Sequence, residues 1–367
     1  MSRKKHRKKE RLGSRILRFV GRFFIWFFVS LLLLLCGAYA FFHLVNKGPS
    51  PHLRDLFVVS AMESSAGGIL AKIYLSDEEI EAILKKNSMK ESTEITDTTL
   101  VSVMTAEKRA QESVSSNESG EMLVSDDPDG DGIEVHDIKG AMYRGKMMIV
   151  HDPSRVKVSC IPTFTSGGGG WTLQQHIENN GAVGGINGGK YEDESGLGMG
   201  GMPEGIVLSN GELRMGVPGG TYGVYGFTND NVLVVGNMTA QQAINMGVRD
   251  AVSFGPALIT NGKSASYKGV GGGLNPRTAI GQRADGAVLL LVIEGRRSTS
   301  LGAAMSDLIE VMEEYGAVNA ANLDGGMSSS MILYDEKLVD NCQIRDSRRI
   351  PTAFIVMPQK TEEGGNQ

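Results

Sequence analysis

The stretch NAANLDGGMSSSMIL (319–333) decides the fold, because it places acid and hydroxyl groups on a turn of bare backbone. The apolar residues on either side of the turn predict two buried strands. Glycine has no Cβ and accepts positive φ, so Gly325 and Gly326 let the chain turn sharply and come close to a ligand. A carboxylate at the end of a buried strand is typical of sites in α/β proteins, which makes Asp324 a catalytic candidate. An ordinary Asp-Gly hairpin turn is the alternative explanation.

Several other segments also combine glycines and polar groups with apolar runs. They are DPSRV (152–156), GGINGGKYED (184–193), SFGPALITNGK (253–263), NPRTAIGQRADGAVLLLVIEGRR (275–297) and SRRIPTAFIV (347–356). Their order and spacing resemble the phosphodiester glycosidase family from about residue 130 to 358. That family is typified by the enzyme that uncovers mannose 6-phosphate by removing N-acetylglucosamine from a phosphodiester. Its bacterial members are often described as exopolysaccharide-related proteins.

The periodicity of the outward part of the chain predicts an α/β (α+β) fold, with a central mixed β-sheet and flanking helices. Three helices are predicted in this part of the chain. Two begin at the candidate capping residues Thr172 and Thr239, and the third is a glycine-bounded apolar run that begins at about Leu301. The continuous apolar run from 287 to 293 predicts a central strand covered on both faces. Helices precede both INGG and NLDGG, so the two loops are expected to meet at one edge of the sheet.

A basic tail and an apolar run open the chain of 367 residues. Residues 1–22 carry ten Lys and Arg against one Glu. Residues 23–45 have no charged side chain and are long enough to cross a ~30 Å hydrocarbon core as one helix. The pattern predicts a membrane partner and no nucleic acid, with the N-terminus cytoplasmic and the rest of the chain extracellular. A cleaved signal peptide ending at Ala38-Tyr39-Ala40 is the alternative. Cys36 is most simply a membrane-core residue.

The predicted organisation has five parts. They are a basic cytoplasmic tail (1–22), a transmembrane signal-anchor (23–45), a juxtamembrane helix with a Ser/Thr/Glu-rich linker (46–126), a phosphodiester glycosidase-like domain (127–360) and a polar tail (361–367). Ser76 and Glu79 form a capping box for the juxtamembrane helix. The segment from 87 to 126 has little apolar surface, which predicts a linker or mobile arm.

Two further features left alternatives open. Asp127, Asp129 and Asp131 have the spacing that opens a calcium loop, but Ile138 stands where the bidentate Glu is needed. A structural calcium and an acidic turn before the first strand are both compatible with this pattern, and no other metal or cofactor is expected. Cys160 and Cys342 lie on the outward side, where either a disulfide or two separate buried thiols can form.

A sugar-1-phosphodiester site needs a phosphate grip, proton-handling carboxyl groups and polar groups for the sugar. Asp324 is expected to act as base or nucleophile at the anomeric carbon, with Glu294 as the second carboxylate. Arg277 can grip phosphate bidentately, or can instead satisfy loop carbonyls. The remaining predicted binding residues are Asn187, Gly188, Gly189, Thr278, Arg296, Asn322, Gly325, Gly326, Ser328 and Ser329. Lys190 and Met327 depart from the family pattern and leave the substrate open.

The sequence therefore predicts a membrane-anchored glycosidase that hydrolyses a sugar-1-phosphodiester bond in exopolysaccharide or cell-wall glycan metabolism. Its partner would be a glycan-phosphate or polysaccharide substrate. A non-catalytic polysaccharide-binding or assembly protein is one alternative. A metal-dependent phosphodiesterase that cuts the P–O bond is the other.

Overall fold

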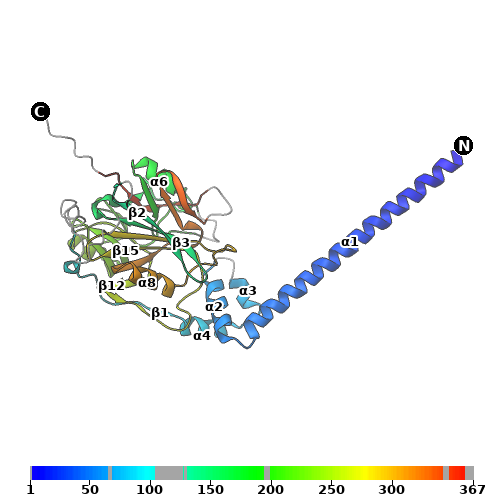
Figure 1. The fold of residues 1–367 in the computed structure, drawn as a ribbon, viewed down its shortest axis with the longest axis horizontal. Helices are drawn as coiled ribbons and strands as arrows, with labels where there is room; N and C mark the ends of the chain where they lie inside the picture. Colours follow the sequence, from blue (N-terminus) through cyan, green and yellow to red (C-terminus); the bar gives the residue numbers. More distant parts are fainter. Residues whose placement is uncertain are drawn as a thin grey trace, which may run out of the picture.

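The computed structural model describes residues 2–64, 68–103, 127, 130–193, 199–341 and 347–359, with the backbone alone for residues 2–17. Figure 1 shows α1 (Ser2–Lys47) projecting from the sheets as one long helix. Within it, Arg18–Lys47 is long and apolar enough to cross a membrane, and none of its most apolar window is buried. This is consistent with a signal anchor or a membrane span. A small helical bundle packs at the C-terminal end of α1: α2 (Pro51–Met62), α3 (Gly68–Lys72) and α4 (Asp77–Lys86).

Three larger sheets make up most of the rest of the described structure, and two two-stranded sheets add to them. The seven-stranded sheet has the order β13 (Lys263–Ser264), β12 (Ala257–Thr260), β17 (Ala317–Leu323), β15 (Arg277–Arg283), β16 (Val288–Ile293), β3 (Arg144–Val150), β2 (Ile133–Lys139). One five-stranded sheet has the order β10 (Leu233–Thr239), β9 (Thr221–Thr228), β11 (Val248–Val252), β7 (Val207–Ser209), β8 (Glu212–Met215). The other has the order β19 (Glu336–Asp340), β18 (Ser330–Leu333), β6 (Gly184–Asn187), β21 (Thr352–Val356), β4 (Val156–Cys160).

The inner faces of the three sheets share one apolar core. Leu290 and Val292 from β16, Phe227 from β9 and Phe354 from β21 all lie in it. The outer face of each sheet is covered by one helix: α8 (Met305–Glu314), α7 (Ala240–Asn245) and α6 (Leu173–Asn179), respectively. Strand β16 is therefore buried on both faces, which explains its continuous apolar run.

The predicted class, sheets with flanking helices behind one long apolar N-terminal helix, is confirmed. The single mixed sheet is corrected to three sheets, in which every strand pair described is antiparallel. Strands buried on both faces and strands with alternating apolar and polar residues occur in a single mixed sheet and in several antiparallel sheets. The hydrophobic pattern of the sequence therefore could not distinguish these two arrangements. The capping boxes at Ser76, Thr172 and Thr239 are confirmed. The last helix begins at Met305, and Leu301 is exposed outside it.

The start of the predicted linker is packed onto the sheets, which corrects its interpretation as a mobile arm. Strand β1 (Met89–Lys90) pairs with β14 (Ser266–Tyr267). The Thr96 hydroxyl accepts from Val235 N at 2.8 Å, and Ser102 N donates to Ala284 O at 2.8 Å. Backbone hydrogen bonds to existing strands compensate for the low apolar content of this segment. Residues 104–126 lie outside the described part of the chain.

Candidate active site

Strand ends from two sheets meet at one place. Thr278, the second residue of β15, pairs with Leu323, the last residue of β17, so Arg277 and Asp324 lie at the same edge of the seven-stranded sheet. Asn187 ends β6 in the neighbouring sheet. The Asp324 N–H donates to Gly188 O at 3.2 Å, and the Asn187 side-chain amide donates to Asp324 O at 2.6 Å. The INGG and NLDGG loops therefore meet, as the sequence predicts.

Glycine is required at two points of this junction. A Cβ on Gly188 would lie 2.6 Å from Thr352 Oγ1, so only glycine allows the INGG loop to pass this close. Gly326 has φ +63°, in the left-handed region that L side chains rarely adopt. It begins a short 3₁₀ turn, Gly326–Ser328, and its N–H donates to Pro276 O at 2.9 Å. The Asp324 loop is thereby joined to the Asn275-Pro276-Arg277 segment.

A cavity of about 180 Å³ lies between these loops. Six of the residues predicted from sequence line it: Arg277, Arg296, Asp324, Gly325, Gly326 and Ser328. Eight further residues complete the lining: Glu63, Tyr191, Asp193, Phe254, Asn275, Pro276, Met327 and Arg348. Met327 lies in the lining, as Asp324 does. Lys190 pairs instead with Glu204, at 2.5 Å, outside the lining.

One side of the cavity is an anion pocket that holds the carboxylate of Glu63; we call Glu63, Gly273, Asn275 and Arg277 the Arg277 wall. The Arg277 guanidinium donates to Glu63 Oε2 at 2.5 Å, and the Asn275 amide donates to the same oxygen at 3.0 Å. Gly273 N donates to Glu63 Oε1 at 3.0 Å. Glu63 follows α2, so a residue from the N-terminal bundle fills a pocket built by the domain. This donor set suits any small oxyanion.

Arg277 also has the structural role that the sequence left open. Its side chain donates to Ala303 O at 3.1 Å and to Gly273 O at 2.7 Å, and the residue is only 7% exposed. The neighbouring Arg296 has φ +56°, an uncommon backbone conformation for arginine that is often found at functional sites. Arg296 donates to Asn275 Oδ1 at 3.2 Å and forms no ion pair with a carboxylate among the described residues. It supplies a positive charge to the cavity that no described acid neutralises.

Asp324 is a second charged group that lines the cavity. Burial, with a smaller contribution from the charge of Asp193, raises the pKa of its carboxyl group to about 7. The Ser328 side chain, the Gly325 N–H at 2.9 Å and the charge of Arg348 act in the other direction. A carboxyl group that exchanges its proton near pH 7 is suited to general acid or base chemistry.

A hydrogen-bonded group surrounds Asp324, and we call these residues the Asp324 wall: Tyr191, Asp193, Asp324, Ser328 and Arg348. Arg348 pairs with Asp193 at 2.6 Å and donates to Tyr191 Oη at 2.7 Å. The Tyr191 and Ser328 hydroxyls are 3.0 Å apart. Burial, together with the charge of Asp324, raises the pKa of Tyr191 to about 12, so this phenol keeps its proton.

Glu294 does not line the cavity. Its carboxylate lies 3.8 Å from the Arg297 guanidinium, and its backbone carbonyl accepts from the Ser300 hydroxyl at 2.7 Å. Besides Asp324 and the Arg277-bound Glu63, the lining holds the carboxylate of Asp193. The assignment of Glu294 as the partner carboxylate stays a prediction from the family pattern.

The other predicted binding residues support the loops from behind the cavity. The fully buried Asn187 amide accepts from the Thr278 hydroxyl at 2.8 Å and from Ser330 N at 3.1 Å, besides holding Asp324 O. The Asn322 amide donates to Gly255 O at 2.8 Å. The remaining ones, Gly188, Gly189 and Ser329, also lie outside the lining. Their contacts fix the positions of Asp324 and Arg277, and direct substrate contact by these residues is untested.

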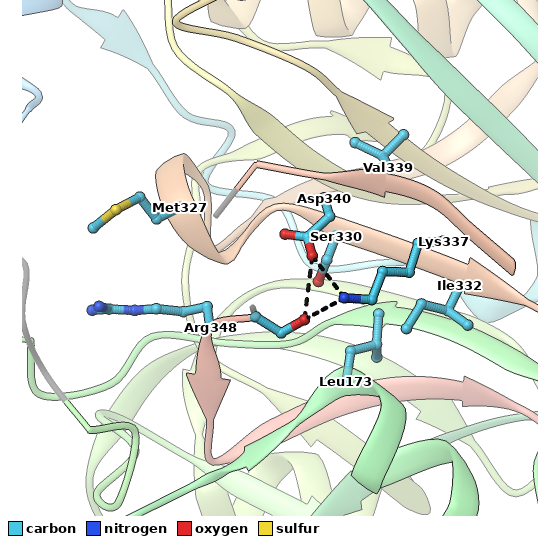
Figure 2. Close-up of a pocket in the computed structure, with 9 residues that line it drawn as sticks. Leu173, Met327, Ser330, Ile332, Lys337, Val339, Asp340 and Arg348 are labelled. Atoms are coloured by element: carbon cyan, nitrogen blue, oxygen red, sulfur yellow. Dashed lines mark hydrogen bonds and ion pairs between the residues drawn. The ribbon is translucent and has the colours of Figure 1, made fainter. Parts of the chain in front are cut away.

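A second, much smaller hollow of about 10 Å³ lies behind Met327 and Arg348. Figure 2 shows these two side chains extending the same way, away from Lys337 and Asp340. Lys337 pairs with Asp340 at 3.4 Å and donates to Ser347 at 3.0 Å. The hollow has room for about one water molecule. Its lining residues therefore pack closely around the start of the Arg348 side chain and leave no room for a second substrate.

The acidic loop before β2 forms turn contacts in the described residues. Asp127 Oδ2 accepts from Gly132 N at 3.0 Å, and Asp131 Oδ1 accepts from Ile133 N at 2.8 Å. Asp129 lies outside the described residues, and so does Cys342, the proposed partner of Cys160. Calcium at this loop and pairing of the two cysteines stay predictions. Burial raises the pKa of the Cys160 thiol.

Three charged cavity residues, Glu63, Asp193 and Arg348, were missed from sequence. Asp193 and Arg348 stand inside segments that carry the family resemblance, GGKYED and SRRIP, and their charge was the available signal. Glu63 lies more than two hundred residues before Arg277, in the juxtamembrane segment. A charge in a helical segment outside the domain gives no local indication that it enters a pocket.

Comparisons with known proteins support the sequence resemblance. The family model described as phosphodiester glycosidase matches residues 180–357, just under half of the chain. A curated relative, the uncharacterized protein YomE derived from the SPbeta prophage of Bacillus subtilis (strain 168), is 32% identical over 121 residues. That match covers 31% of this chain and 19% of the relative, so the chain spans about a fifth of the relative's length.

Solved structures also match this chain. The catalytic domain of zebrafish N-acetylglucosamine-1-phosphodiester alpha-N-acetylglucosaminidase, described as auto-inhibited by its pro-peptide, matches with a TM-score of 0.50 and 18% identity, over 63% of this chain and 85% of that chain. A hypothetical protein from Synechocystis matches with a TM-score of 0.46 and 15% identity, over 62% of each chain. The resemblance to the phosphodiester glycosidase family is confirmed over residues 180–357, and the fold matches that of the zebrafish domain.

Proposed function

We propose that this protein is a membrane-anchored glycosidase that hydrolyses a sugar-1-phosphodiester bond outside the cytoplasm, in exopolysaccharide or cell-wall glycan metabolism. The family match over residues 180–357 and the shared fold support a glycosidase-like activity. The similar zebrafish enzyme is named for removal of N-acetylglucosamine from a phosphodiester, and we extend that substrate class to this chain.

One observation carries the proposal: an oxyanion pocket and a carboxyl group with a pKa of about 7 line the same cavity. The Glu63 carboxylate occupies the pocket at the position where a substrate phosphate would sit. A phosphate would therefore exchange with Glu63 and receive the same donors from Arg277, Asn275 and Gly273. Arg296 adds a positive charge beside them.

Hydrolysis breaks the bond between the anomeric carbon and the phosphate oxygen, and it forms a bond from that carbon to a water oxygen. The products are the free sugar and a phosphomonoester. In this arrangement the Arg277 wall holds the leaving phosphate and stabilises its charge. Asp324 acts at the anomeric carbon as base or nucleophile, and the pKa of about 7 keeps a large share of it ionised at neutral pH.

The N-terminal helix supplies the proposed location. Ten Lys and Arg precede the apolar run, so we place residues 1–22 in the cytoplasm and the sheets outside. The helix Arg18–Lys47 has the length and composition of a single span.

The test measures which product the full chain in detergent releases from a GlcNAc-1-phosphodiester and from UDP-GlcNAc. Wild type, Asp324→Asn and Arg277→Ala are compared with and without a chelator. We expect free GlcNAc from wild type, insensitive to chelator, and strong loss in both variants. Sugar phosphate as the product, or loss with chelator, would indicate a metal-dependent phosphodiesterase. No turnover by folded protein on these or on wall-derived glycans would indicate a polysaccharide-binding protein.

A further inference from the structure

Helix α3 has apolar side chains on its outer face as well as on its inner face. Ala71 and the following Leu75 are buried in the small core of the bundle. Ile69 on α3 and Ile73, directly after its last residue, are linked at i and i+4 by the Ile73 N–H to Ile69 O hydrogen bond at 3.2 Å and remain 69% and 60% exposed. The surface side of a helix in water normally carries polar residues, so this outer face needs an apolar neighbour.

The neighbouring helix α4 provides the contrast within the same bundle. Its Ile80 and Ile83 are buried, whereas Asp77, Glu78 and Glu81 are exposed. This is the distribution of a helix that faces water. The apolar outer face of α3 is therefore a local property of that helix and not a general property of the bundle.

Contacts with α1 fix the level of α3 along the apolar span. The rings of Tyr74 and Tyr39 lie 5.6 Å apart, and Tyr74 Oη donates to Tyr39 O at 3.3 Å. Tyr39 stands eight residues before Lys47, the end of α1, which is about 12 Å back along the helix. A span that starts at Phe23 needs about 20 residues to cross the hydrocarbon core, so it ends near Phe42. Tyr39 thus lies at the outer boundary of the bilayer, and α3 lies beside it.

We propose that the exposed face formed by Ile69 of α3 and the following Ile73 inserts into the outer interface of the lipid bilayer as a second membrane contact beside α1. The inference rests on the proposed membrane-anchored function. Figure 1 shows α3 beside the C-terminal end of α1, and the Tyr39–Tyr74 ring contact joins α1 to the residues that follow α3. The occupant of the apolar face is therefore the bilayer that α1 crosses.

The same bundle holds the Arg277 wall. Ser60 Oγ, on α2, accepts from Leu274 N at 2.8 Å, and Glu63, directly after α2, enters the anion pocket. A bundle inserted in the interface places this pocket at the membrane surface. The substrate class that follows is a glycan phosphodiester carried on a membrane lipid, in preference to a freely diffusing one.

The first experiment measures depth without using activity. Single spin labels are attached at Ile69→Cys, Ile73→Cys, Glu81→Cys and Leu33→Cys in full chain whose native cysteines are replaced by serine. Each protein is reconstituted into phosphatidylcholine–phosphatidylglycerol vesicles. Collision with oxygen, which concentrates in lipid, is compared with collision with a water-soluble nickel chelate.

We expect oxygen to dominate at Ile69, Ile73 and Leu33, and the nickel chelate to dominate at Glu81, the matched position on α4. Labels at Ile69 and Ile73 that behave like Glu81, with Leu33 in lipid, would overturn the inference and leave the anchor intact. A water-exposed Leu33 would overturn both the inference and the proposed anchor.

The second experiment tests the substrate class with the double variant Ile69→Glu/Ile73→Glu. Two charges oppose insertion, so turnover of a GlcNAc-1-phosphodiester carried on a lipid in vesicles should fall by about tenfold. Turnover of a water-soluble GlcNAc-1-phosphodiester by the same vesicles should be unchanged, because neither isoleucine lies in the cavity. Equal turnover of both substrates before and after the change would contradict the preference for a lipid-carried glycan, and so would an equal loss on both.

Discussion

The two walls of the cavity hold opposite charges in opposite ways. In the Arg277 wall, a cation is kept buried by a carboxylate that the chain itself supplies, Glu63. In the Asp324 wall, burial keeps a carboxyl group partly neutral and raises its pKa to about 7, although Arg348 lies close. In the Arg277 wall the buried charge is neutralised by a charged partner. In the Asp324 wall the exclusion of water disfavours the charged form of the carboxyl group.

The difference separates binding from proton chemistry. A paired cation can exchange its partner for a substrate phosphate at little electrostatic cost, since one anion replaces another. A partly neutral carboxyl group is unfavourable for the folded state at neutral pH, and such costs are typical of catalytic positions. Changes at Asp324 should therefore affect rate and pH dependence most, and changes at Glu63 should affect affinity most.

The largest effect is expected for Asp324→Asn, which preserves the shape of the side chain and removes the titrating group. We expect kcat on a sugar-1-phosphodiester to fall by about 10²- to 10⁴-fold, the range for loss of an acid or base. The wild-type rate should also change with a pKa near 7, rising with pH if Asp324 acts as base or nucleophile. Steady-state kinetics from pH 5 to 9 on both proteins measures this. A loss smaller than tenfold would remove Asp324 from the chemistry.

The same variant should be more stable than wild type above pH 7. The folded state holds the Asp324 proton up to about pH 7, whereas the unfolded chain releases it near the ordinary value of 3.8. Stability contributed by this group therefore falls as pH rises from about 4 to 7, and the penalty is complete above 7. Over about three pH units it amounts to at most about 4 kcal/mol in the free energy of unfolding. Denaturant unfolding at pH 5 and pH 8 should show the larger gain at pH 8.

Asp137→Asn is the matched control for that measurement. Asp137 is exposed, and the Lys146 ammonium at 2.8 Å lowers its pKa, so the sign is opposite to that of Asp324. This variant should gain no stability at pH 8. An equal gain in both variants would mean that net charge, and not burial of Asp324, controls the pH dependence.

The fold could be predicted from sequence where local signals are strong. The capping boxes at Ser76 and Thr172 mark helix starts correctly, because each depends on residues three positions apart. Strand direction and sheet number could not be predicted, because β16 looks the same in a parallel and in an antiparallel sheet when both faces are covered. Pairing over long sequence distances determines that choice.

The site shows the same limit. The loops with Arg277 and Asp324 were identified because glycines and polar groups stand next to apolar runs, and antiparallel register then places them at one edge. At the cavity, Asp193 pairs with Arg348, and Arg348 donates to Tyr191. Glu63 enters through packing of a different part of the chain. Such contacts are tertiary, and no local pattern records them.

A smaller effect is expected for Glu63→Gln, which sharpens the contrast between paired and unpaired charge. Removing the competing carboxylate should strengthen binding of inorganic phosphate or a phosphodiester by about tenfold, or about 1.4 kcal/mol. kcat should change little, because Glu63 leaves the pocket when substrate binds. Calorimetric titration with phosphate and the KM of the full chain measure the change.

Glu79→Gln is the control for Glu63. It removes one carboxylate from the same bundle, where Glu79 pairs with Lys47 at 2.9 Å away from the cavity. Its phosphate affinity should match wild type. Equal affinity in the Glu63 variant and wild type would show that Arg277 only holds the carbonyls of Ala303 and Gly273.

The smallest effect separates the two candidates for the second carboxylate, Asp193 and Glu294. The charge of Asp193 raises the pKa of Asp324. The Asp193→Asn variant should therefore shift the rising limb of the pH–rate profile to lower pH, by less than about one pH unit. Arg348, released from Asp193, adds to the shift in the same direction. Glu294→Gln should leave the limb in place, since its carboxylate lies beside Arg297 and outside the cavity. If Glu294→Gln instead abolishes turnover while Asp193→Asn does not, the family pattern is right about the second carboxylate, and the cavity must rearrange to bring Glu294 to the sugar.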